Sequence, residues 1–236
     1  MSLSKDLRDL RLFVGKMRLH SVGLGAIRDF RSWQRSLEKG NSPLKDEVPW
    51  INFASLKKLR EILKPDFVAF EFGGGGSTLF LSKHVKQVFT VEHDPQWFGF
   101  VVEKMKSLGR TNWTGSIIVA EKAATMNTDY SNPDLFLSAD DNYRGMSFEK
   151  YVTSIDKFPD EHFDFVMVDG RSRPSCLKHS FPKIKPGGFL LLDNSERDYY
   201  LSKIDMKAAG FTIIFNQFGP GPYAINFSQT TIWQKR

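Results

Sequence analysis

The chain has 236 residues and a mass of 27.0 kDa, with 41% hydrophobic and 25% charged residues. This length can bury a sizeable core, and 21 phenylalanines with a net charge of only +6 exclude a mainly disordered chain. No apolar run reaches the ~18 residues that a membrane span requires, and the first residues lack the apolar core of a secretory signal. The single cysteine, Cys176, excludes an internal disulfide and a multi-cysteine metal site, so we expect a cytoplasmic protein.

Most of the net charge lies in the N-terminal segment, because residues 1–40 contain nine basic and four acidic residues. Apolar side chains recur there at helical spacing, namely Leu7, Leu10, Val14 and Met17. This pattern predicts an amphipathic helix with a basic face. We expect residues 1–49 to form a basic helical cap and residues 50–236 to form the main domain. The basic face could contact a membrane surface or an acidic partner, or it could stay solvated while the helix docks on the core.

From Trp50 onward, short apolar runs typical of buried strands alternate with stretches of helical periodicity. The predicted strands are residues 68–72, 87–92, 116–121, 163–169, 188–193, 211–218 and 229–235. The last two are joined by a Gly-Pro-Gly-Pro loop that is too short for a crossover helix, so we expect them to pair antiparallel at the sheet edge. The alternation as a whole predicts an α/β fold with a largely parallel sheet.

A glycine-rich turn, residues 73–76, follows the first predicted strand and opens a helix. Consecutive glycines let the backbone approach a ligand closely, and the amides at a helix N-terminus favour negative or polar groups. Glu92 ends the second strand, 21 residues after Glu71, where a carboxylate can accept hydrogen bonds from both hydroxyls of a ribose. The combination predicts a ligand that contains a nucleoside. The alternative is an ordinary tight turn with Glu92 facing solvent.

Two departures from the dinucleotide-binding motif narrow the choice of ligand. Thr78 stands where the third glycine of G-x-G-x-x-G would be, and Glu71 lies two residues before the first glycine. A carboxylate at that position would repel a pyrophosphate but suits a ligand that carries an ammonium group. S-adenosylmethionine has an ammonium group and a ribose but no phosphate, so we expect it to be the cofactor.

These residues resemble the class I S-adenosylmethionine-dependent methyltransferases over about residues 50–236. Glu71-x-Gly73-x-Gly75 is similar to their first motif, and Val91-Glu92-His93-Asp94 is similar to their second. The segments PWINF, EFGGGGST, VEHDPQW, VDGRSR and LLLDN together resemble, more narrowly, a bacterial-type group of small methyltransferases. The resemblance implies a Rossmann-like fold with a mostly parallel seven-stranded sheet, an antiparallel C-terminal strand and an added N-terminal helical segment.

The resemblance also implies roles for individual residues. Glu71 would support the methionine ammonium group of the cofactor, and Glu92 would bind its ribose. Glu121, the acid after the predicted third strand, would lie near the adenine. Gly73, Gly75 and Ser77 would form the turn that passes beneath the cofactor.

Candidate catalytic residues follow the fourth and fifth predicted strands, namely Asp169, Asp193 and Asn194. Ligands of an open α/β sheet gather at this carboxyl edge. Two carboxylates and an amide oxygen suit Mg²⁺, and the trio resembles the metal site of catechol-type O-methyltransferases, where the metal lowers the pKa of the acceptor hydroxyl. Arg171 and Ser172 stand where that family has an Asp and a Lys. The alternative is that Asp169 caps a turn or orients the substrate directly, with Asn194 as a helix cap.

The sequence thus predicts methyl transfer to an oxygen of a small-molecule acceptor, with Asp169 as the catalytic residue. Arg171 and Arg173 could clamp an acidic acceptor or form surface salt bridges. The loop at residues 219–223 is a candidate lid. One alternative function is a cofactor-binding scaffold that has lost catalysis. The other is a nucleic-acid methyltransferase, which is disfavoured because the fourth strand has no Asn/Asp-Pro-Pro-Tyr/Phe motif and the basic excess is local.

Overall fold

A computed structural model describes residues 3–236 of the chain. Seven strands form one sheet, and among the strands described in it β9 runs opposite to the other six. In spatial order they are β3 (Trp113–Ile117), β2 (Gln87–Glu92), β1 (Val68–Phe72), β6 (Phe163–Val168), β7 (Ile184–Asp193), β9 (Ser228–Lys235) and β8 (Phe211–Gly219). Two short strands, β4 (Glu121–Lys122) and β5 (Met146–Ser147), pair separately. The predicted Rossmann-like sheet and its antiparallel C-terminal pair are confirmed.

The third strand differs from its predicted bounds of 116–121, because β3 begins and ends earlier. It pairs with β2 only as far as the partners Glu92 and Ile117, where β2 itself ends. A strand continues only while a neighbour supplies hydrogen bonds, so the chain leaves the sheet after Ile117. Glu121 consequently lies in β4, outside the main sheet.

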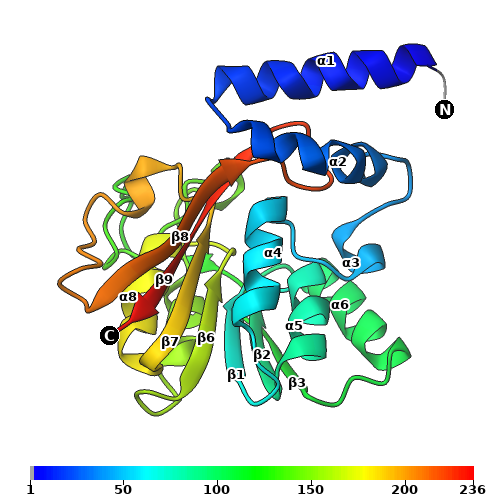
Figure 1. Cartoon of the computed structure of the whole chain (residues 1–236). Helices are drawn as coiled ribbons and strands as arrows, with labels where there is room; N and C mark the ends of the chain where they lie inside the picture. The colour runs from blue at the N-terminus through cyan, green and yellow to red at the C-terminus, as the bar shows by residue number, and fades with distance from the viewer. Residues whose placement is uncertain (1–2) are drawn as a thin grey trace.

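Helices cover both faces of the sheet (Figure 1). One face carries α4 (Phe53–Ile62), α5 (Gly76–His84) and α6 (Pro95–Ser107), and the other carries α7 (Glu149–Val152), the 3₁₀ helix η3 (Thr153–Ile155) and α8 (Arg173–Lys183). Side chains alternate between the faces along each strand, so in β1 Ala69 packs toward α4 and α5 while Phe70 and Phe72 pack toward α7 and α8. This alternation buries the central strands β1, β2, β6 and β7 between two apolar layers, whereas the edge strands β3 and β8 stay partly exposed.

The N-terminal segment forms a separate helical layer, which we call the N-terminal lobe, from α1 (Leu3–Leu19), η1 (Leu24–Asp29) and α2 (Phe30–Ser36). Of the apolar face predicted for the first helix, Met17 is buried and Leu10 packs partly inward, whereas Leu7 is 52% exposed. The buried cluster of the lobe consists of Phe13, Met17, Phe30, Trp33 and Phe227. Because Phe227 belongs to the β8–β9 connection, the lobe is fastened to the C-terminal hairpin, as Figure 1 shows. None of the helices described is both long and apolar enough to cross a membrane.

A short helix, α3 (Pro43–Asp46), links the lobe to the main sheet and runs beside α5. The remaining 3₁₀ helices are η2 (Asp141–Tyr143) and η4 (Asp198–Tyr200). The predicted division into a cap of residues 1–49 and a domain of residues 50–236 stays a prediction.

Candidate functional site

The glycine-rich turn lies where β1 passes into α5. Gly73 has a φ of +92°, and its amide donates to the Val91 carbonyl at 2.9 Å. A Cβ at Gly73 would lie 2.8 Å from the Cα of Gly170, so only glycine allows the ends of β1 and β6 to approach this closely. The turn therefore brings three strand ends, those of β1, β2 and β6, to one edge.

Glu92 organises this turn through both carboxylate oxygens. Oε2 accepts from the Gly74 amide at 2.9 Å, while Oε1 accepts from the amides of His93 and Asp94 at 2.7 and 2.9 Å. The side chain is almost fully buried, so the alternative of a solvent-facing Glu92 is not what the structure has. A carboxylate oxygen has two acceptor positions, so Oε2 keeps one for a ligand hydroxyl.

Glu71 is fully buried beneath the same turn. Its Oε1 accepts from the hydroxyls of Thr78 and of Thr90, the latter at 2.8 Å. Its Oε2 has no hydrogen-bond partner among the described residues. Burial raises the pKa of Glu71 to about 7, although the hydroxyls of Thr78, Thr90 and Ser77 act in the opposite direction. An unpartnered buried oxygen is costly, and a ligand ammonium group is a donor that would satisfy it.

Arg173 fastens the carboxyl ends of β6 and β7 together. Its Nε donates to the Gly170 carbonyl at 3.0 Å, and its Nη2 donates to the Asp169 carbonyl at 2.8 Å and to Asp169 Oδ1 at 3.0 Å. Its Nη1 donates to the Asp193 carbonyl. With each nitrogen engaged and the residue only 8% exposed, Arg173 holds the backbone of the site instead of reaching into solvent.

Asp169 and Asp193 of the predicted magnesium trio lie near each other at this edge, and Asn194 follows β7 with a φ of +50°, but the partners of the two carboxylates do not suit a metal site. Asp193 Oδ1 accepts from the Thr230 hydroxyl at 2.7 Å, and burial raises the pKa of Asp193 to about 8, with a further contribution from the nearby Asp169. Burial also raises the pKa of Asp169, against the opposing charge of Arg173. Metal ligands must be deprotonated and free to coordinate. Apart from this set of two aspartates and an asparagine, residues 3–236 contain no cluster of three or more His, Cys, Asp or Glu side chains that could hold a metal ion.

Arg171 forms the exposed rim of the site and contacts a loop that lies about 30 residues earlier in the chain. Its Nη1 lies 2.9 Å from Asp140 Oδ2, its Nε donates to His93 Nε2 at 3.2 Å, and its guanidinium lies 5.4 Å from the Tyr143 ring centroid. The Arg171 side chain remains 37% exposed. The sequence marks Asp140, Asp141 and Tyr143 as a polar connecting loop that could close over an acceptor or stay solvated, but the contacts with Arg171 are visible only in the tertiary structure.

Tyr151, on α7, is a site residue that sequence analysis missed. It is fully buried, its hydroxyl has no partner in the described chain, and a Cβ at Gly170 would overlap that hydroxyl. Tyr151 thus lies against the same glycine that contacts the turn. A single tyrosine in a four-residue helix gives no sequence signal for such a position, because it is equally typical of an ordinary core residue.

The structure places Ser77 at the glycine turn but Glu121 away from it. Ser77 is buried in the first turn of α5, next to the glycines. Glu121 is exposed in β4, and its carboxylate pairs with Lys150 Nζ at 2.6 Å. No described contact joins Glu121 to the glycine turn, whereas Glu71, Ser77 and Glu92 come together there.

The loop predicted to be a lid, residues 219–223, is packed beneath the N-terminal lobe and α3. The Pro220 carbonyl accepts from the Phe53 amide at 3.0 Å, and the Tyr223 amide and hydroxyl donate to Ser36 Oγ and Asp46 Oδ2 at 3.0 and 2.8 Å. Residues 219–222 are buried in this position. In the described conformation the loop therefore joins the lobe and α3 to the C-terminal strands, and it does not cover the candidate site as a lid would.

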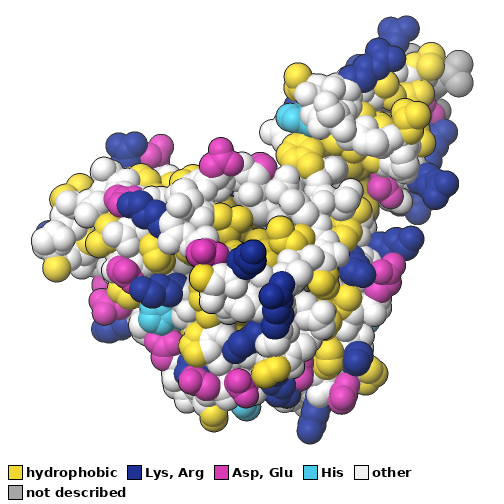
Figure 2. All heavy atoms as spheres, turned by 60° about the vertical axis from the view of Figure 1, so that its left-hand side comes forward, with side chains coloured by type: hydrophobic (Ala, Val, Ile, Leu, Met, Phe, Trp, Pro, Cys, Tyr) yellow, Lys and Arg dark blue, Asp and Glu magenta, His cyan; other side chains and the backbone are white. Residues whose placement is uncertain are grey.

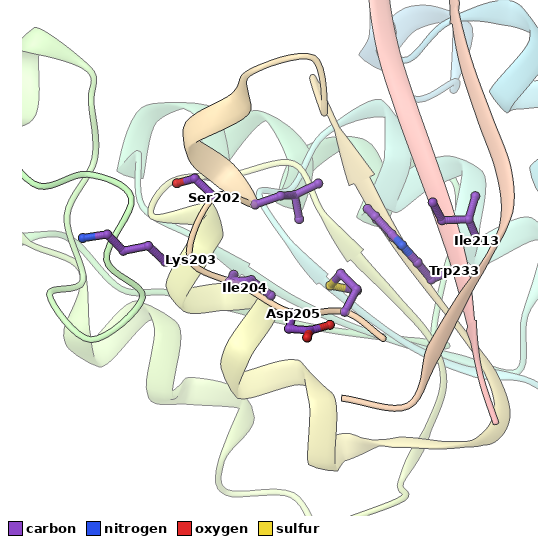
Figure 3. Close-up of a pocket in the computed structure, with 8 residues that line it drawn as sticks. Ser202, Lys203, Ile204, Asp205, Ile213 and Trp233 are labelled. Carbon is purple, nitrogen blue, oxygen red and sulfur yellow. The ribbon is translucent and has the colours of Figure 1, made fainter. Parts of the chain in front are cut away.

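A surface hollow of about 490 Å³ lies on another part of the molecule, between residues 201–206 and the last two strands (Figure 3). Ile213 and Trp233 line its strand side. None of its lining residues belongs to the glycine turn or to the Asp169 edge, so we do not assign it to the candidate site.

Comparison with known proteins identifies the fold. No protein-family model matches the chain, and no curated protein matches it significantly. Among solved structures, a candidate O-methyltransferase from Klebsiella pneumoniae superposes with a TM-score of 0.53 at 16% identity, covering 97% of this chain and 99% of the other. The fold is that of the class I methyltransferases.

Two further structures share this class I methyltransferase fold. A candidate methyltransferase from Streptococcus mutans, solved with S-adenosylhomocysteine, has a TM-score of 0.50 at 16% identity, covering 78% of this chain and 96% of the other. A precorrin-6y C5,15-methyltransferase from Geobacter metallireducens has a TM-score of 0.50 at 18% identity, covering 77% and 86%. At these identities the likeness concerns the fold, and the chemistry has to be argued from the site.

Proposed function

We propose that this chain is an S-adenosylmethionine-dependent methyltransferase that acts on an oxygen of a small-molecule acceptor. The observation that carries the proposal is the joining of Glu71, the glycine turn and Glu92 at one edge of a class I methyltransferase fold. The Streptococcus structure with S-adenosylhomocysteine and the Klebsiella candidate O-methyltransferase support it.

The residues around the turn fit the functional groups of the cofactor. Glu71 Oε2 has no donor within residues 3–236 and would accept from the ammonium group. Glu92 Oε2 has one acceptor position left for a ribose hydroxyl. Gly73, Gly75 and Ser77 would pass beneath the ligand. Glu121 near the adenine has the least support, because its carboxylate already pairs with Lys150.

Bound S-adenosylmethionine supplies a methyl group on a sulfonium sulfur, which keeps the C–S electron pair when an acceptor oxygen forms the new C–O bond. The acceptor hydroxyl must then lose its proton. Asp169 is the base we assign, because burial raises its pKa and a base of raised pKa holds a proton more readily. Arg173 orients Asp169 through Oδ1, and Arg171 at the rim would contact an acidic acceptor. We assign no step to a metal ion.

The test is calorimetric titration of S-adenosylhomocysteine into the wild-type protein and the variants Glu92→Gln, Glu92→Ala and Glu103→Ala. We expect micromolar binding that both Glu92 variants weaken at least tenfold, about 1.4 kcal/mol. Glu92→Gln keeps the side-chain size and one of the two acceptor oxygens. Because the other oxygen becomes an NH2 group that cannot accept from the turn amides, thermal unfolding of both Glu92 variants must show that the fold is retained. Glu103 is an exposed glutamate on α6 and serves as the matched control.

The same titration with Mg²⁺ or with EDTA should give equal affinities, because Asp169 already pairs with Arg173 and Asp193 accepts from Thr230. Absence of binding in all conditions would overturn the proposed function. Binding without production of S-adenosylhomocysteine from any hydroxyl-bearing acceptor would favour the scaffold alternative, and production with RNA as the acceptor would favour the nucleic-acid alternative.

A further inference from the structure

The outward side of α1 combines basic and apolar side chains. Its exposed positions, which we call the outer α1 face, are Lys5, Leu7, Arg8, Arg11, Leu12, Gly15, Arg18 and Leu19. The three leucines are 52%, 39% and 73% exposed in chain order. No acidic residue belongs to this face, which holds four cations among eight positions. A surface of this kind attracts a partner that is both negatively charged and able to accept aliphatic groups.

The two acids of α1 are turned the other way, toward the rest of the lobe. Asp6 Oδ1 and Asp9 Oδ2 both accept from Gln34 Nε2, at 2.8 and 3.0 Å. Arg31 adds an ion pair to Asp6 at 3.7 Å. The two carboxylates of α1 are therefore engaged on the side of the helix that faces the lobe, and neither lies on the outer α1 face.

The outward cations are consequently left without strong partners. In the part of the chain that the structure describes, no carboxylate pairs with Lys5, Arg11 or Arg18, and Arg8 lies 4.0 Å from Asp9 with a side chain 76% exposed. Figure 2 shows the lobe standing away from the sheet body, with dark blue and yellow side chains next to each other on its surface. The following helix η1 adds exposed Leu24 and Ile27 to the same lobe.

We propose that the outer α1 face binds the surface of a lipid bilayer that contains anionic headgroups. Arginines attract such headgroups over about a Debye length, and their long side chains reach the phosphates while neighbouring leucines enter the acyl boundary. A nucleic acid would meet the arginines through its phosphates but would leave the exposed leucines without apolar partners. A second copy of the chain would bring like charges together.

Vesicle co-sedimentation of the full-length protein tests this proposal. We expect binding to phosphatidylcholine vesicles that contain roughly a third phosphatidylglycerol, little binding to phosphatidylcholine alone, and weaker binding at high salt. The triple variant Arg8→Gln, Arg11→Gln, Arg18→Gln should lose binding at least about tenfold. The double variant Leu12→Ser, Leu19→Ser should also bind more weakly at unchanged charge.

The matched control removes three exposed cations from the sheet body, through Lys86→Gln, Lys106→Gln and Lys207→Gln. It has the same net charge as the arginine variant and should bind like wild type. Equal losses in both triple variants, or no binding of the wild type to anionic vesicles, would overturn the proposal. Binding to a structured RNA that depends on the arginines but not on the leucines would replace it with a nucleic-acid surface. These measurements need no cofactor, so their failure is independent of the S-adenosylhomocysteine titration.

Discussion

Single buried carboxyl groups govern the chemistry at the edge of the sheet. Burial raises the pKa of Glu71 to about 7 and that of Asp193 to about 8, so both groups hold protons near neutral pH more readily than they would in water. The protonation of Glu71 matters most for the proposed function, because an ammonium group is bound best by the ionised form. Cofactor affinity and protein stability should therefore both change with pH as Glu71 ionises, around its pKa of about 7.

The pH dependence of stability provides a prediction for Glu71. The folded-state pKa of about 7 lies above the ordinary value of 4.5, so the folded chain binds the proton more tightly than the unfolded chain. The free energy of unfolding should therefore fall as pH rises from about 4.5 to about 7, by about 3 kcal/mol for this group. Glu71→Gln cannot ionise and should remove this part of the decline, as measured by urea unfolding at several pH values.

The raised pKa of Asp193 also makes the free energy of unfolding fall as pH rises. Because Asp193 is present in both wild type and Glu71→Gln, its contribution cancels when the two pH profiles are subtracted. The exposed variant Glu103→Gln is the control and should keep the wild-type pH profile. If Glu71→Gln and wild type lost stability in parallel over this range, the assigned pKa of Glu71 would be wrong.

At the scale of elements, the start of α8 is joined to the ends of two strands by Arg173. One guanidinium serves three carbonyl oxygens and the Asp169 carboxylate, so it couples β6, β7 and α8. Buried ion pairs contribute little net stability when complete, but removing one partner leaves the other charge uncompensated.

We predict that Arg173→Met lowers the free energy of unfolding by about 3–5 kcal/mol, because it leaves Asp169 and several carbonyls without donors in a buried place. Arg171→Met should cost less than about 1 kcal/mol, because that side chain is partly exposed and its ion pair is screened by water. Denaturant unfolding of both variants checks the difference. Similar losses would show that Arg173 has no special role in joining the strand ends.

For the whole molecule, the attachment of the N-terminal lobe depends on a small aromatic cluster. Trp33 is fully buried, contacts Phe13 and Phe30, and donates through Nε1 to the Ala224 carbonyl at 2.9 Å. The cluster is separate from the two large cores that flank the sheet. The lobe can therefore loosen while the sheet stays folded.

We predict that Trp33→Ala weakens this attachment by about 3–5 kcal/mol, the usual range for truncating a buried tryptophan. Limited trypsin digestion should then cleave faster after Arg31 and Arg35 and leave a stable fragment that contains the sheet. Trp50→Ala, at a position 52% exposed, is the control and should keep the wild-type digestion pattern. Simultaneous digestion of lobe and sheet in Trp33→Ala would show that they unfold as one unit.

Local patterns in the sequence were sufficient for the order of strands and helices, for the glycine turn and for the antiparallel C-terminal pair. Strand and helix periodicities follow from burial on one face, and glycine is required where φ is positive or backbones touch, so neighbouring residues carry these signals. The spacing from Glu71 to Glu92 likewise belongs to one β–α–β unit, and the two acids do meet at the glycine turn.

Only the tertiary structure shows the contacts around the carboxyl ends of β6 and β7. Arg173 lies between the ends of two strands, Tyr151 rests against Gly170, and Asp140 reaches Arg171. The end of β3 was also decided there, since it depends on where the ladder of β2 stops. Burial and charge compensation at these positions come from elements that meet only after the sheet has assembled, and such contacts leave no periodic pattern in the chain.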